Sequence, residues 1–190
     1  MCSSDRINDA GLDCDFRIES ALDSCAFFLE GSSGNIGFDT CSLDAWGATY
    51  KALQLRSIGN LSASDLTLNL SQNAYNSGGP WNYQTANSAT LYQQGLGAHL
   101  FYSAGSGSAD AVISWDNRFF INTSETVFND DQNDIDFRIE SVNQTHAFFL
   151  DGATNRIGLS KSTLAPWTTA WAGIEVGGTG GIHSQVATGA

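Results

Sequence analysis

The chain has few of the residues that would place it in several common functional classes. Of its 190 residues only 15% are charged, and 8 Lys and Arg against 20 Asp and Glu give a formal net charge of −12 at pH 7. A charge of that sign repels phosphate backbones and anionic membrane surfaces, so nucleic-acid binding is not expected. No apolar run approaches the roughly 18 to 20 residues that span a bilayer, so membrane insertion is not expected either. The first residues show no apolar segment typical of a secretory signal peptide, which favours folding in a cytosol.

Motifs of catalysis are also scarce. The histidines His99, His146 and His183 stand far apart, and the chain contains no GxSxG, HExxH or Walker sequence. Glycan hydrolysis needs a pair of carboxylates. Glu19 and Glu140 occupy equivalent positions of two repeats, and a site repeated along a shaft suits a solvent-facing strand better than an active centre. We therefore expect no enzyme activity and no cofactor.

Metal-ligand patterns are equally sparse. The acidic run Asn129–Asp134 is the best candidate, because runs of carboxylate and amide oxygens suit Ca²⁺. It lacks the glycine and the distal glutamate of an EF-hand loop, and its counterpart early in the chain keeps only part of it. We expect a solvated acidic turn there and no bound metal.

The chain has four cysteines, Cys2, Cys14, Cys25 and Cys41, and none after residue 41. They form no CxxC pair of the kind that binds zinc. The second copy of the repeat described next has other residues at the corresponding positions, so the repeated fold does not require a disulfide framework. For a chain that folds in a cytosol, the prediction is four reduced thiols.

What the chain does have is an internal repeat. The hexapeptide Asp15–Ser20 occurs again as Asp136–Ser141, 136 − 15 = 121 positions later, and the match continues without a gap for some forty residues. Further matching pairs are Ala26–Leu29 with Ala147–Leu150, Ile36–Gly37 with Ile157–Gly158, Leu43 with Leu164, and Trp46 with Trp167. Two segments that stay in register over this length are two copies of one structural module.

Within each copy apolar and polar residues alternate, as in strands with one buried face. The first copy predicts strands over 15–20, 25–29, 35–38 and 52–55, and helical signals are almost absent. Antiparallel pairing across the first turn would place Ile18 near Phe27 and Phe16 near Leu29 on one apolar face. Each copy is therefore predicted to be a β-meander of about four strands with one wet face, and Phe148, the counterpart of Phe27, is expected to be buried.

Between the copies lies a separate β segment with its own turn signals. The sequence thus predicts an all-β chain in three parts: a repeat unit at 1–58, a middle β domain at 59–124, and a second, incomplete repeat unit at 125–190. The strands expected in the middle part are Leu66–Leu70, Ala89–Gln93, His99–Ser103, Ala111–Trp115 and Phe119–Ile121.

A series of short motifs follows in fixed order along about residues 8–176: DFRIES, HAFFLDG and NRIGL in the second copy, and NAY, GPWNY, ATLYQQ, GAHLFY, SGSA and ISW in the middle segment. In order and spacing this series resembles a repeat common in bacteriophage tail fibres and related virion proteins. The family's usual Val-Gly-Ile-Gly ending is Ile36–Asp39 here, so the turns are expected to differ in detail. The resemblance implies an elongated structural virion protein, a tail fibre segment involved in host-cell recognition and attachment.

The same resemblance implies partners and a location. The expected partners are two further copies of the chain in a parallel homotrimer, other tail or baseplate proteins, and a host-surface glycan or protein. The location is the virion, after assembly in the host cytoplasm. Open alternatives are a capsid (head) fibre or another virion appendage and, more weakly, a glycan-degrading tailspike or a cellular adhesin.

Physical arguments support the trimer and nominate its residues. A small sheet with one apolar face is marginal alone in water, and covering that face with symmetry mates also protects its edges. Trp46 and Trp167 recur at one phase of the repeat and are predicted to pack between chains. Trp81 and Tyr83, beside a Gly-Gly-Pro loop, are the candidates for receptor contact, since aromatic faces stack on sugar rings.

Overall fold

The computed structural model describes residues 13–166, 171–178 and 180–185. Every regular element in these ranges is a β-strand, which confirms the predicted all-β class. No helix in the described ranges is long and apolar enough to cross a membrane. The chain divides into two compact units, Met1–Val127 and Phe128–Ala190. The first copy of the repeat and the middle segment therefore belong to one unit, and the second copy forms the other.

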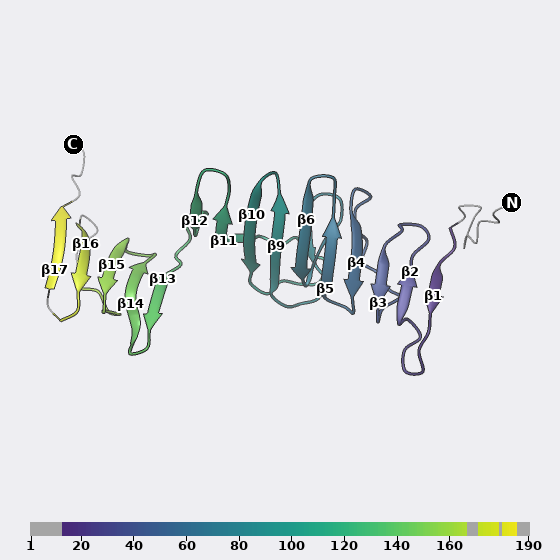
Figure 1. Ribbon diagram of the computed structural model, residues 1–190, viewed down its shortest axis with the longest axis horizontal. Coiled ribbons are helices and arrows are strands. Elements are labelled where there is room, and N and C mark those ends of the chain that lie inside the picture. The colour runs from purple at the N-terminus through teal and green to yellow at the C-terminus, as the bar shows by residue number, and fades with distance from the viewer. Residues whose placement is uncertain (1–12, 167–170, 179, 186–190) are drawn as a thin grey trace. The chain divides into compact units, whose positions relative to one another are not determined.

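The first unit is built on a ten-stranded sheet, in the order β1-β2-β3-β4-β5-β6-β9-β10-β11-β12, whose strands stand side by side in Figure 1. A two-stranded hairpin, β7 and β8, is excluded from this row. The strands are β1 (Phe16–Ile18), β2 (Phe27–Leu29), β3 (Ile36–Phe38), β4 (Lys51–Leu55), β5 (Gly59–Ala63), β6 (Thr67–Gln72), β7 (Ala74–Asn76), β8 (Trp81–Tyr83), β9 (Ala89–Gly95), β10 (Ala98–Ala104), β11 (Asp116–Ile121) and β12 (Thr126–Phe128).

The second unit is a five-stranded sheet, in the order β13-β14-β15-β16-β17. It occupies the green to yellow end of the chain in Figure 1. Its strands are β13 (Phe137–Ser141), β14 (Gln144–Asp151), β15 (Arg156–Leu159), β16 (Trp171–Val176) and β17 (Gly180–Gln185).

The two copies of the repeat pair their strands in the same register. Phe16 lies opposite Leu29 and Ile18 opposite Phe27 in the first copy, and the residues 121 positions later pair in the same way in the second. Because a slip of one residue would turn every side chain to the other face, the identical pairing confirms that the copies are one module.

The fourth strand of each copy departs from the predicted antiparallel meander. β4 runs parallel to β3, and β16 runs parallel to β15. A parallel pair cannot be joined by a tight turn, so the chain must cross back over one face of the sheet before β4 begins. Residues 39–50 make this crossover in the first copy.

Two glycines at equivalent positions allow the crossover to lie flat on the sheet. A Cβ atom on Gly37 would sit 2.3 Å from the backbone oxygen of Thr40 and 2.9 Å from Leu43. A Cβ atom on Gly158 would meet Lys161 and Leu164 in the same manner, at 2.6 and 3.0 Å. No side chain fits at either position. The crossover segment therefore covers the face of the sheet on which Gly37 and Gly158 lie.

In each copy the crossover buries the phenylalanine that lies on the covered face of the sheet. Phe28 and Phe149 each expose only 7% of their surface, whereas Phe27 and Phe148 are half-buried. The expectation that Phe148 is buried is therefore wrong for a single chain. The alternation was correct, but the apolar face of Phe27 and Phe148 is the one that the chain leaves uncovered.

The middle segment differs from its prediction in two places. β5 was not expected, and its pairing with β4 makes the first repeat and the middle segment one continuous sheet. Ala111–Trp115 was expected to be a strand, but it contains only an isolated bridge between Val112 and Asn82. Ile113 is nevertheless buried, in a cluster with Ala74 of β7 and Tyr83 of β8. This burial accounts for the apolar pattern that suggested a strand.

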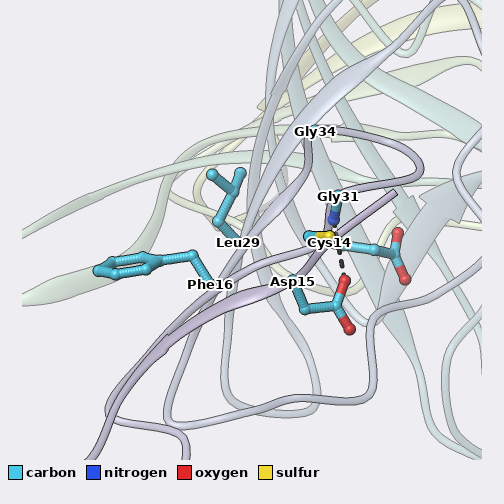
Figure 2. A pocket seen from close by; sticks show the side chains of 7 residues that line it. Cys14, Asp15, Phe16, Leu29, Gly31 and Gly34 are labelled. Atoms are coloured by element: carbon cyan, nitrogen blue, oxygen red, sulfur yellow. Dashed lines mark hydrogen bonds between the residues drawn. The ribbon is translucent and has the colours of Figure 1, made fainter. Parts of the chain in front are cut away.

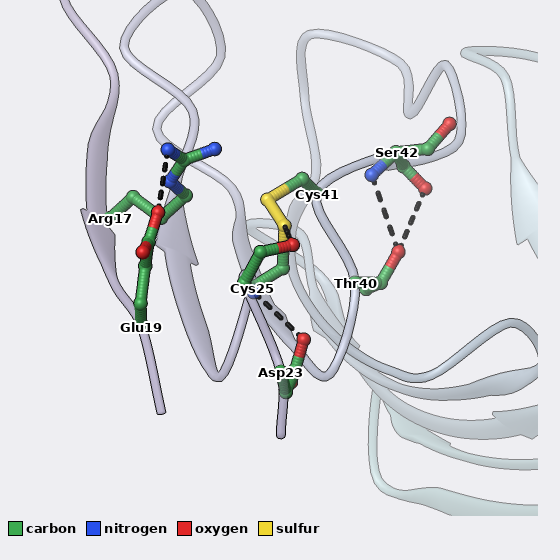
Figure 3. The surroundings of a disulfide bond; sticks show 8 residues. Arg17, Glu19, Asp23, Cys25, Thr40, Cys41 and Ser42 are labelled. Atoms are coloured by element: carbon green, nitrogen blue, oxygen red, sulfur yellow. Dashed lines mark hydrogen bonds and ion pairs between the residues drawn. A yellow bond between two sulfur atoms is a disulfide. The ribbon is translucent and has the colours of Figure 1, made fainter. Parts of the chain in front are cut away.

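The cysteine prediction is also wrong in part. Cys25 and Cys41 form a disulfide, with their Cα atoms 5.5 Å apart (Figure 3). Cys14 is a free, exposed thiol, and Cys2 lies outside the described residues. The bond joins the residues that precede β2 and follow β3. The second copy has no cysteine, which correctly indicated that the module does not need a disulfide. It did not exclude a disulfide in the first copy.

Candidate interaction surfaces

One face of the ten-stranded sheet carries an unbroken row of apolar side chains. Residues that lie directly opposite one another on paired strands project to the same face. Following these pairs from β1 to β11 gives the apolar row, defined here as Phe16, Leu29, Ile36, Leu53, Leu61, Leu70, Tyr92, Phe101 and Phe119. The row contains no charged residue, in a chain whose net charge is −12.

The apolar row is open to solvent in the single chain. Leu70 exposes 57% of its surface, and Leu61 and Phe101 expose 42% and 41%. Beside the row, Ile18, Phe38 and other apolar residues are exposed as well. Contiguous exposed apolar surface of this kind marks a site of association rather than an ordinary solvent face.

The second unit repeats the pattern. Phe137, Leu150, Ile157 and Ile174 are successive cross-strand partners, and so are Ile139, Phe148 and Leu159. Ile139 and Leu159 expose 52% and 36% of their surfaces. Each unit therefore presents an uncovered apolar face of the same construction.

The opposite face of the first sheet is polar but buried. Gln54, Asn60 and Ser71 are cross-strand partners there, and each exposes 4% or less of its surface. The Asn60 amide donates hydrogen bonds to Ser71 Oγ at 3.3 Å, to the Ala74 carbonyl at 3.1 Å and to Gln84 Oε1 at 2.9 Å. These partners offset the desolvation of the amide, which is otherwise costly inside a protein.

Asn73 anchors the hairpin to this polar interior. It is fully buried and has a φ of 57°, in the left-handed region that asparagine tolerates better than most residues. Its Nδ2 donates to the carbonyls of Thr85, Asn87 and Ser88 at 3.0 to 3.1 Å. Its Oδ1 accepts from the backbone N–H and the hydroxyl of Thr85 at 2.7 and 2.8 Å. One side chain thus fixes the loop between β8 and β9.

An aromatic cluster joins the crossover to the hairpin. The ring centroids of Trp46 and Tyr50, from the crossover, lie 6.2 and 6.1 Å from that of Trp81 on β8. The ring centroid of Trp115 lies 6.4 Å from that of Trp81. Tyr75 on β7 lies 6.3 Å from Trp46. Edge-to-face contacts at these separations are favourable for aromatic rings. Trp81 is only half-buried, and it follows the exposed residues of the β7–β8 turn.

The residues nominated from the sequence fall in different surroundings. Trp46 exposes 8% of its surface and is buried within its own chain. Tyr83 exposes 6% and donates its hydroxyl to the Gly105 carbonyl at 2.6 Å, so its ring offers no free face to a receptor. Trp81 retains exposed surface. Trp167 lies outside the described residues.

Carboxylates border the aromatic cluster. Tyr75 donates its hydroxyl to Asp110 at 3.0 Å, and burial, with the nearby Asp110 carboxylate, raises the pKa of Tyr75 to about 12. Burial also raises the pKa of Asp44, although hydrogen bonds from Gln84 and Gln54 partly offset this effect. Trp46 and Trp81 were singled out from the sequence, but their contact was not predicted, because the members of this cluster are far apart in the chain.

A pocket of about 470 Å³ opens beside the first hairpin (Figure 2). Asp15 accepts a hydrogen bond from the Gly31 N–H at 2.9 Å, and Glu30 accepts one from Ser33. Both carboxylates of the lining are thus engaged in shaping the turn. Gly31 is required there, since a Cβ would lie 2.6 Å from the Cys14 backbone. The described residues contain no group of three or more His, Cys, Asp or Glu arranged to hold a metal.

The second unit contains a buried carboxylate, that of Glu175, whose pKa is lowered. Glu175 exposes 3% of its surface and occupies the position of Gln54 in the first copy. Burial alone would raise the pKa of Glu175. The hydrogen bonds from Lys161 and the Ala165 N–H, with the positive charges of Lys161 and Arg156, outweigh burial and lower the pKa. Asp44 N–H donates to Gln54 in the same way as Ala165 N–H does to Glu175, at 3.1 and 2.7 Å.

Comparisons with known proteins leave the family open. No protein-family model matches the chain, and no curated protein matches it. Among solved structures, Geobacillus virus E2 ORF18 is similar with a TM-score of 0.39 and 14% identity over 63% of this chain. The matched part spans 26% of that protein. A TM-score of this size does not establish a shared fold.

Proposed function

We propose that the chain is a segment of a bacteriophage tail fibre, a structural and non-enzymatic virion protein that takes part in host-cell recognition and attachment. The repeated module and the motif series along it resemble such fibres. The observation that carries the proposal is the apolar row, because it is a long, uncharged apolar strip whose side chains remain partly or largely exposed among the described residues of a single chain. A fibre built from several chains accounts for both features.

In this proposal the row is covered by further copies of the same chain, in a parallel homotrimer. The row crosses nine strands that lie about 4.8 Å apart, so it extends over roughly 40 Å. A partner must offer an uncharged apolar strip of matching length and spacing. A second copy in register offers both, in each of the two units. Rotation of identical faces about an axis closes the assembly without leaving exposed apolar surface.

Attachment would use the opposite side of the sheet, where the aromatic cluster reaches the surface at Trp81. A half-exposed indole can stack on a sugar ring or pack against a protein side chain. The other proposed partners are tail or baseplate proteins that hold the fibre on the virion after assembly in the host cytoplasm.

Four measurements test the proposal. Light scattering of the purified chain is expected to give a mass near three times 20.2 kDa. A well-folded monomer would refute the trimer. Gold-labelled antibodies against the chain are expected to mark the tail in electron micrographs of virions, and added protein is expected to compete with virions for adsorption to host cells. Label on the capsid would instead identify a head fibre, and oligosaccharide released from host capsule would identify a tailspike enzyme.

A further inference from the structure

The disulfide lies at the weakest part of the repeat module. β1, β2 and β3 have three residues each, whereas the equivalent strands β13, β14 and β15 have five, eight and four. Shorter strands form fewer ladder hydrogen bonds, so the first copy holds its hairpin with less backbone pairing than the second. The bond between Cys25 and Cys41 closes a ring across both strands of that hairpin, with a sequence separation of 16.

The second copy reaches the same register by noncovalent contacts. His146 and Ser162 stand where the first copy has Cys25 and Cys41, and the His146 ring packs edge-on against Phe149 at 5.0 Å. The module therefore forms without a disulfide where its strands are long. Where they are short, the covalent bond replaces pairing, which makes the local stability of the first copy depend on the oxidation state of two sulfurs.

Both cysteines are accessible to small thiol reagents. Cys25 and Cys41 are each half-buried, and Figure 3 shows the bond beside the turn that carries Asp23, whose carboxylate accepts a hydrogen bond from the Cys25 N–H at 2.7 Å. Exchange with a dissolved thiol or disulfide therefore needs no unfolding of the sheet.

We propose that the Cys25–Cys41 bond is a redox-controlled lock on the first repeat, open in a reducing cytosol and closed outside the cell. Closure proceeds by thiol–disulfide exchange with a small oxidised disulfide such as glutathione disulfide. The two cysteine thiols lose two protons and two electrons, the protein S–S bond forms, and the glutathione S–S bond is reduced to two thiols. Closing the lock fixes β2 and β3, which contribute Phe27, Leu29, Ile36 and Phe38 to the apolar face.

The full chain, with Cys2 and Cys14 replaced by Ser so that only the pair remains, tests the proposal in reduced and oxidised glutathione buffers. Alkylation followed by mass measurement is expected to find two free thiols in the reduced buffer and none in the oxidised one. Amide hydrogen exchange over 25–41 is expected to be faster in the reduced chain by a factor on the order of 100, the ratio that a closed ring of this size supplies. Exchange over β13 to β15 is expected to be unchanged.

The double variant Cys25→Ser, Cys41→Ser provides the matched control and should behave as the reduced chain does in both buffers. Three results would overturn the proposal. These are two alkylated cysteines in the oxidised buffer, equal exchange over 25–41 in both redox states, or an equal increase in both repeats on reduction. The last result would show that the bond supports the whole chain rather than the first copy.

Discussion

Replacement of Leu70 by Asp separates the stability of the single chain from that of its assembly. Leu70 lies in the middle of the apolar row and exposes 57% of its surface in one chain. Complete burial of a leucine side chain contributes about 1.5 to 3 kcal/mol, so the part still available to assembly is roughly 1 to 1.7 kcal/mol per chain. Three copies lose about 3 to 5 kcal/mol, and each buried unpaired carboxylate adds a further cost of several kcal/mol.

The expected result is dissociation of Leu70→Asp to a folded monomer, measured by light scattering, with the β-sheet circular dichroism signal retained. Leu96→Asp is the matched control. Leu96 is 85% exposed, lies in the turn between β9 and β10, and has a φ of 53°, which Asp tolerates well. It stands outside the apolar row, so its replacement should leave the oligomer intact. If Leu70→Asp kept the oligomer, or if both variants lost it, the apolar row would not be the interface.

Four further results are expected. Asn73→Ala should lower the free energy of unfolding by about 3 kcal/mol, because it removes the acceptor of the Thr85 N–H and the donor to three loop carbonyls and places Ala at a positive φ. Thermal denaturation should show a lower Tm for Asn73→Ala than for Asn73→Gly, because glycine adopts a positive φ without strain. Gly152→Ala should destabilise the second unit, because its Cβ would lie 2.6 Å from the Ile135 backbone, whereas Gly105→Ala, with nothing within 4 Å, should be neutral in the same denaturant titration. The pKa of Glu175 is lowered on folding, so its ionised carboxylate contributes stability above its unfolded pKa, and this contribution declines as pH falls through the lowered value. The pH-dependent contribution should be absent from Glu175→Gln. A difference in the free energy of unfolding between the two proteins that does not change with pH would contradict this. Trp81→Ala should weaken competition for host adsorption without changing the oligomer, and equal competition by variant and parent would exclude Trp81 from the contact.

The fold was predictable where local alternation decides it. The pairing of Phe16 with Leu29 follows from the spacing of apolar residues and the length of one turn, and the repeat then extends the result to the second copy. The parallel alignment of β4 was not predictable in this way, because the crossover over Gly37 is a contact between segments with no shared periodicity. A glycine in the middle of a short strand was the available signal, since such a glycine often marks a close backbone approach.

The candidate surfaces were predictable only in part, for a reason that concerns polarity. Sequence patterns assign asparagine and glutamine to the solvent side, and on this chain Asn60 and Gln54 are buried while Leu70 and Phe101 are exposed. Hydrogen bonds to loops distant in sequence make the polar side of the sheet its interior. The disulfide was not predicted, because comparison of the two copies identifies only features that both share. A bond that occurs in one copy alone cannot be found in this way.

The division of polar and apolar residues between the two faces has a calorimetric consequence. Exposure of apolar surface raises the heat capacity on unfolding, and exposure of polar surface lowers it. A chain that hides Asn60, Asn69 and Asn73 and leaves the apolar row in water should unfold with a heat-capacity increment per residue below that of ordinary globular domains. Association of the chains buries the apolar row and should therefore show a negative heat-capacity change. Because hydrophobic stabilisation weakens on cooling, cooling should separate the chains before it unfolds the sheet within each chain.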